Sequence, residues 1–97
     1  MMTFEMILEV FADYLRKDKD YEVVLTSRGY AVMGWDDGQN NWNTVEHCAT
    51  PEALRDHLLD AFCGFLALKM TDGDRPLTDA EERKIEAARQ EMVDRCQ

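Results

Sequence analysis

The chain has 97 residues, of which 45% are hydrophobic and 32% are charged, and this composition excludes both a disordered chain and a membrane protein. Twenty acidic residues against eleven basic ones give a net charge of −9, which disfavours direct binding of nucleic acid. The length suffices for a single domain, and the amino terminus lacks the basic and apolar segments of a signal peptide.

The first predicted element is a helix over residues 4–15. Apolar residues recur at helical spacing from Phe4 to Leu15, which predicts one apolar face about three turns long. Thr3 is typical of a helix N-cap, and Glu5 suits the positive end of the helix dipole.

Three strands are predicted next, over residues 21–26, 30–35 and 42–48. In each, successive side chains should point to alternate faces, and each contains the β-branched or aromatic residues that are typical of strands. Turn-forming residues at 27–29 and 36–40 separate them, so consecutive strands should pair as an antiparallel meander.

A long central helix should follow. Thr50, Pro51 and Glu52 are typical of a helix start, and the apolar face that follows them is wide. We expect Leu58 and Phe62 to be deeply buried. Gly64 within this helix should destabilise it by about 1 kcal/mol relative to Ala, which close approach of another element would explain.

The carboxyl-terminal part, residues 71–97, should be a peripheral helix after a turn. Residues 78–81 predict a capping box, and the apolar stripe from Ile85 to Cys96 is narrow. This helix lies either at the edge of the domain or against a second copy, as in a homodimer. The predicted fold is a single α+β domain over residues 1–97. Its elements in order are a helix, a three-stranded antiparallel meander and two further helices, and the first two helices pack on one face of the sheet.

No catalytic, cofactor-binding or metal site is predicted. His57 and Cys63 lie six residues apart on one helix, and His47 and Cys48 point to opposite faces of a strand, so the four do not converge on zinc. Cys48, Cys63 and Cys96 form no C-x-x-C pair and are odd in number, which indicates reduced thiols and a soluble, cytoplasmic protein. A small thiol-dependent enzyme that uses Cys48 or Cys63 is an alternative.

Acidic residues, some of them beside aromatic ones, are the candidate contacts with a partner. Trp35 and Trp42 flank an acidic turn and form either a core or cross-strand pair or an exposed contact. The acidity serves either solubility or the docking of a basic protein, such as one that binds nucleic acid. The partner-binding candidates are Trp35, Asp36, Asp37 and Trp42 and, on the last helix, Glu81, Glu82, Glu86 and Glu91.

The chain resembles small acidic proteins of phages and conjugative elements in its element order and its acidity. It also shares with them the tripeptide Lys19-Asp20-Tyr21, which leads from the first helix into the first strand. Residues 3–70 resemble the compact anti-CRISPR proteins that inhibit the nuclease of type II-A CRISPR systems, while the well-capped last helix departs from them. The resemblance implies a non-catalytic protein-binding module, an inhibitor or regulator whose acidic residues occupy the DNA-binding groove of a nuclease. It transfers no individual site residue. A self-associating structural protein is the alternative function.

Overall fold

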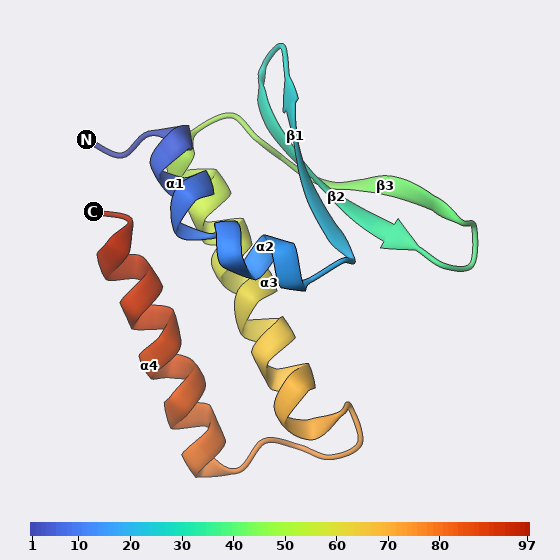
Figure 1. Ribbon diagram of the computed structural model, residues 1–97, viewed down its shortest axis with the longest axis vertical. Coiled ribbons are helices and arrows are strands. Elements are labelled where there is room, and N and C mark those ends of the chain that lie inside the picture. The colour runs from blue at the N-terminus through green and yellow to red at the C-terminus, as the bar shows by residue number, and fades with distance from the viewer.

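Helices and a small twisted sheet form the molecule, and the computed structural model describes residues 1–97 (Figure 1). The elements in chain order are α1 (Phe4–Val10), α2 (Ala12–Lys17), β1 (Tyr21–Thr26), β2 (Gly29–Asp36), β3 (Asn41–Cys48), α3 (Pro51–Thr71) and α4 (Asp79–Arg95). The α+β class and the order of helical, strand and helical segments are confirmed.

The amino-terminal helix is interrupted at Phe11, so the single helix expected over residues 4–15 is wrong in detail. Phe11 has φ −93° and ψ 5°, which ends α1 and begins α2. Helical hydrogen bonds nevertheless cross this point, because the Phe11 N–H donates to the Ile7 carbonyl and the Leu15 N–H donates to the Phe11 carbonyl. The interruption coincides with a fully buried ring, which packs edge-on against Phe62.

The three strands form an antiparallel meander with β2 in the centre. Tyr21 pairs with Gly34 at one end of β1, and Tyr30 pairs with Cys48 at one end of β3. The register between β2 and β3 shifts by one residue after Val32. This shift leaves Val45 of β3 as the extra residue of a β-bulge. The bulge affects the lining of the groove described below.

Gly29 is required where β1 turns into β2. Its φ is +116°, and a Cβ on it would lie 2.5 Å from the carbonyl oxygen of Cys48. Any other residue would therefore meet both backbone strain and a clash with β3. Thr26 fastens the same turn, since its hydroxyl donates to the Gly29 carbonyl and accepts from the Arg28 N–H.

The core lies between one face of the sheet and the helices. Phe4 of α1 contacts Tyr30 of β2 with ring centroids 4.9 Å apart, and Val32 on the same face is fully buried. Leu58 is fully buried, as predicted, but Phe62 is only partly buried, because it packs at the margin of the core against Phe11 and Tyr14. The fully buried side chains are Ile7, Phe11, Val32, Cys48, Leu54, Leu58, Leu59 and Cys96.

The β2–β3 hairpin projects away from the helices, as Figure 1 shows. The Cα radius of gyration is 14.0 Å, and the principal extents are 42 × 38 × 18 Å. A compact chain of this length has a radius of gyration of about 12.5 Å. The helices therefore cover only part of the sheet, and the far half of the hairpin has no helix packed on it.

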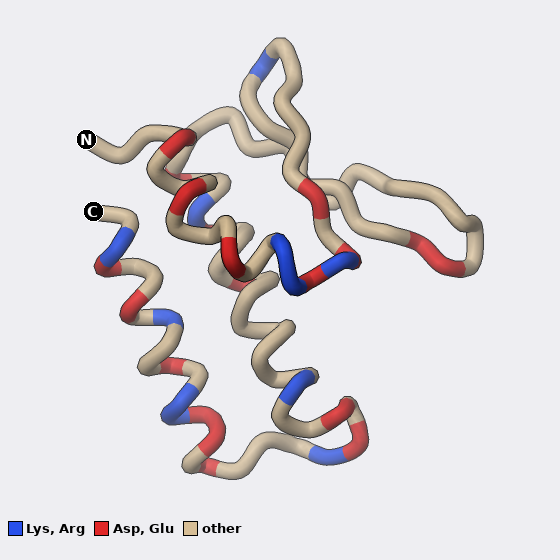
Figure 2. The backbone as a smooth tube through the Cα atoms, viewed as in Figure 1, with Lys and Arg blue, Asp and Glu red and all other residues tan.

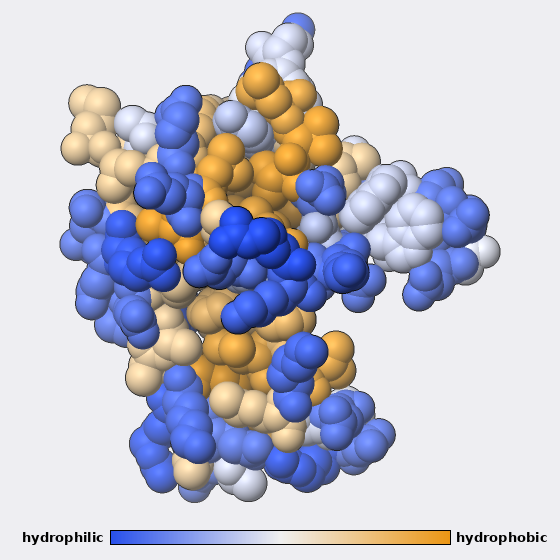
Figure 3. All heavy atoms as spheres, in the orientation of Figure 1, coloured by the Kyte–Doolittle hydropathy of each residue, from blue (hydrophilic) through white to orange (hydrophobic).

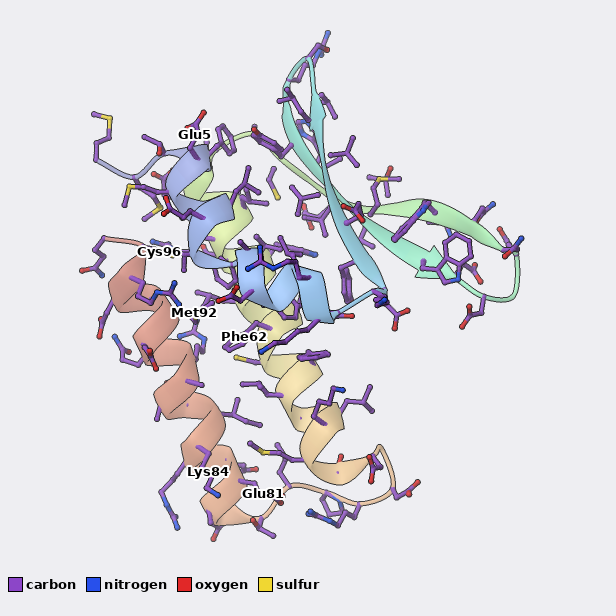
Figure 4. The ribbon with its side chains drawn as sticks, in the orientation of Figure 1. Glu5, Phe62, Glu81, Lys84, Met92 and Cys96 are labelled. Atoms are coloured by element: carbon purple, nitrogen blue, oxygen red, sulfur yellow. The ribbon has the colours of Figure 1, made fainter.

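Helix α4 runs alongside α3 in the opposite direction (Figure 1). Met92 and Cys96 extend from its carboxyl-terminal half into the core (Figure 4). The narrow apolar stripe of α4 is thus covered by the same chain, so a homodimer through this helix would have to use its polar side.

Glu81 links the turn before α4 to the first turn of that helix. Its carboxylate accepts hydrogen bonds from the Arg75 guanidinium at 2.7 and 2.9 Å and from the Thr78 N–H at 2.9 Å, which completes the predicted capping box. These bonds, those from Arg75 foremost, lower the pKa of Glu81 from the ordinary 4.5 to about 2.

This shift predicts a pH dependence of stability. Because the folded-state pKa is depressed, ionised Glu81 stabilises the fold above pH 4.5, and its contribution is lost as the pH falls from 4.5 towards 2. The unfolding free energies of the wild type and Glu81→Gln, from urea titrations, should therefore differ near pH 6 and converge near pH 2. Glu82→Gln, at a carboxylate without an ion pair in the structure, is the control. A pH-independent difference for Glu81→Gln would contradict this account.

Candidate functional site

An open groove separates the β2–β3 hairpin from the second half of α3, and its volume is about 1050 Å³. Figure 3 shows the hollow below the projecting hairpin, with hydrophobic side chains of α3 at its wall. The apolar and small residues that line it are Ala61, Gly64, Phe65 and Leu68 on α3 and, from the sheet and its hairpin turn, Tyr21, Gly34, Trp35, Gly38 and Val45.

The apolar walls of this groove are open to solvent. Leu68 is 58% exposed and Val45 is 48% exposed, although both are large aliphatic side chains. Helix α2 ends at Lys17, at the rim of the groove, so it does not extend over these walls. Gly34 leaves room for Val45, because a Cβ at Gly34 would lie 2.9 Å from Val45 Cγ2.

Carboxylates dominate the rim of the groove. Residues 17–20, in the connection from α2 to β1, contribute two Lys and two Asp, and Asp36, Asp37 and Asp60 complete the rim. Five carboxylates against two ammonium groups give a net charge of −3 around an apolar floor, and four of the five are accessible, because Asp18 is buried. Figure 2 shows the acidic tip of the hairpin at one end of this region and the mixed α2–β1 connection at the other.

A buried hydrogen bond fixes the α2–β1 connection. The Tyr14 hydroxyl donates to Asp18 Oδ2 at 2.6 Å, and Asp18 Oδ1 accepts from the Asp20 N–H at 3.2 Å. Burial, together with this bond to Asp18, raises the pKa of Tyr14 well above its ordinary value of 10, so the phenol remains a donor. The buried Asp18 thereby positions Asp20 at the rim.

The two Trp residues lie at the exposed end of the hairpin as a directly opposed cross-strand pair. Their ring centroids are 5.3 Å apart with planes at 69°, and Trp42 is 40% exposed. The Trp35 indole N–H donates to Asp37 Oδ1 at 2.7 Å. Of the alternatives open from sequence, the structure selects the cross-strand pair and also leaves one of its members exposed.

Asp36 has a structural role in addition to its place on the rim. Its Oδ1 accepts from the backbone N–H groups of Gly38 at 2.9 Å and Gln39 at 3.3 Å, so it closes the hairpin turn. Replacing Asp36 would therefore disturb the turn as well as the charge.

The acidic residues of α4 lie apart from the groove. The Glu81 carboxylate is hydrogen-bonded to Arg75 and Thr78. Glu82 and Glu86 are exposed and lie one helical turn apart, and Glu91 lies on a different side of the helix. Figure 2 shows this helix on the opposite side of α3 from the hairpin. The predicted candidates thus divide into two separate surfaces. Trp35, Asp36 and Asp37 border the groove, whereas Trp42 lies next to Trp35 outside its lining.

Other groove residues were not found by the sequence reasoning. Asp20 and Asp60 are exposed on the rim, and Phe65 and Leu68 line the floor. The sequence does indicate the groove floor, because the apolar face of α3 is unusually wide. This face is wider than the part of it that the neighbouring elements cover.

The three cysteine thiols are free and wholly or partly buried. Cys48 and Cys96 are fully buried, Cys63 is partly buried, and none forms a disulfide. Burial raises the pKa of all three thiols, which favours the protonated, less nucleophilic form. No group of three or more His, Cys, Asp and Glu side chains is arranged to hold a metal ion.

Comparison of the chain with family models, with curated proteins and with solved structures finds no match. None of the helices combines the length and the apolar character needed to span a membrane.

Proposed function

We propose that this protein is a non-catalytic binding module that inhibits or regulates a basic partner protein. The observation that supports this function is the open apolar groove between α3 and the hairpin, with its rim of carboxylates. In line with the resemblance to phage and conjugative-element proteins, the proposed partner is one that binds nucleic acid through a basic surface.

The floor and the rim of the groove would contribute to such binding in different ways. Apolar side chains at Phe65, Leu68 and Val45 lose their contact with water when a partner covers them, which supplies affinity. The carboxylates around them attract Lys and Arg and speed the encounter with a basic surface. The same net charge of −3 repels phosphates, so the groove favours a polypeptide over a nucleic acid.

The Trp pair is the best candidate for an anchor. Trp is enriched among the residues that dominate binding energy at interfaces, and Trp42 is exposed next to Trp35, which lines the groove. The two rings support each other across the strands, so little side-chain entropy remains to be lost on binding.

A second candidate function, a self-associating structural protein, is supported by strand β1. It is an edge strand, and its apolar residues Val24 and Leu25 are exposed. An unpaired apolar edge of this kind is open to pairing with a second copy. Sedimentation that gives a dimer, with unchanged Trp emission, would favour this function over the groove.

Intrinsic fluorescence tests the proposed function. Trp35 and Trp42 are the only Trp residues in the chain, so their emission reports on the hairpin alone. A partner captured with the tagged protein should, after purification, shift this emission on binding. Its association rate should also fall steeply between about 50 and 500 mM salt, because salt screens exposed charges. A purified partner that leaves the emission unchanged and binds at a salt-independent rate would contradict the proposal.

A further inference from the structure

Gly64 is not explained by the packing of its own chain. It lies within α3, is exposed, and has an ordinary helical conformation. A Cβ placed on it would meet nothing within 4 Å, so the fold has room for a side chain there. Glycine within a helix is less stable than alanine. No element of this chain requires the close approach that glycine permits.

We propose that an amphipathic, basic α-helix of the partner occupies the groove and crosses α3 at Gly64. This inference rests on the proposed function and specifies the conformation and chemistry of the bound segment. The groove wall on α3 consists of residues at i, i+3, i+4 and i+7, which form one face of a helix and match the ridge that a second helix packs against. Gly64 at the centre of this face allows the two axes to come close.

The size of the groove suits a short helical segment. A helix treated as a cylinder about 10 Å across, with 1.5 Å rise per residue, occupies about 120 Å³ per residue. The groove volume of about 1050 Å³ is therefore of the same order as two to three turns of such a helix. Four rim carboxylates are accessible, those of Asp20, Asp36, Asp37 and Asp60, and only two Lys residues oppose them, so they select Lys and Arg on the sides of that helix.

An extended segment fits this groove less well than a helix. The wall opposite α3 is the face of the sheet, and Gly34 on that wall belongs to the central strand, whose backbone groups already pair on both sides. A strand in the groove would find no backbone partners, and its buried N–H and C=O groups would remain unpaired. A helix satisfies its own backbone hydrogen bonds.

Two synthetic peptides of identical Lys and Leu composition, each 14 residues long, test the inference. One has Leu at helical spacing, and the other has Leu at every second position, which favours an extended chain. Titration followed by Trp emission should show that the helical peptide binds at least about 10-fold more tightly. Circular dichroism should show its helicity rising on binding.

Gly64→Leu fills the groove floor and should weaken binding of the helical peptide at least 10-fold while leaving the melting temperature equal or higher. Ala87→Leu adds the same side chain to an exposed position of α4 and should bind like the wild type. Leu68→Asn, which removes apolar floor at an exposed side chain without adding charge, should also weaken binding. Equal affinity for the two peptides, or unchanged affinity in Gly64→Leu, would overturn the helix inference. The proposed function is judged separately, because a captured partner would still shift Trp emission if only the helical conformation were wrong.

Discussion

Phe11→Ala should lower the free energy of unfolding by about 3–5 kcal/mol, which is typical of emptying a packed aromatic site. Phe11 is the largest of the fully buried side chains and stands at the junction of α1 and α2. Its ring contacts Phe62 of α3, with centroids 6.4 Å apart in an edge-on arrangement. Its removal would leave a cavity where the amino-terminal helices meet the central helix.

Urea titration of the purified variants measures this loss. Phe62→Ala is the matched control, since it removes the same side chain from a partly buried position on the other side of the same contact. Its cost should be smaller, about 2 kcal/mol, because less apolar surface returns to water and the cavity opens to solvent. A larger loss for Phe62→Ala than for Phe11→Ala would show that the core is centred elsewhere.

The local elements could be predicted from sequence because their signals are local. Helical spacing, capping residues at Thr3, Thr50 and Thr78, and turn residues between the strands each act over a few positions, and all three caps form as expected. The interruption at Phe11 could not be predicted, because the helical pattern of apolar residues runs through it unchanged. Periodicity likewise placed Phe62 on an apolar face without showing that the sheet covers only part of that face.

The groove could be predicted only in part. Trp35, Asp36 and Asp37 were identified from their composition and their place in a turn, and they border the groove. Its floor depends on non-local facts: where α2 ends, how far the hairpin projects, and the bulge that carries Val45. None of these leaves a mark within a short stretch of sequence, so the exposed apolar face of α3 became visible only in three dimensions.

Charge reversal on the rim should slow association with the partner far more than the same reversal elsewhere. Asp20 and Asp60 are exposed, and their carboxylates make no hydrogen bond or ion pair within the chain, so replacing both with Lys should leave the fold intact. They are better targets than Asp36, whose carboxylate closes the hairpin turn.

A matched variant separates position from overall charge. Glu82→Lys with Glu86→Lys changes the net charge from −9 to −5, and so does Asp20→Lys with Asp60→Lys, since each replacement adds two positive charges. The α4 residues are the second acidic surface singled out by sequence, on the other side of α3 from the hairpin. The two double variants therefore differ only in where the charge is placed.

The most direct test of the groove as a binding site is the association rate of the captured, purified partner with these two variants at low salt. The rate should fall at least about 10-fold for the Asp20→Lys and Asp60→Lys variant, and by about 2-fold or less for the Glu82→Lys and Glu86→Lys variant. Equal rates for the two variants, or a larger loss for the α4 variant, would contradict the groove as the site where the basic partner binds.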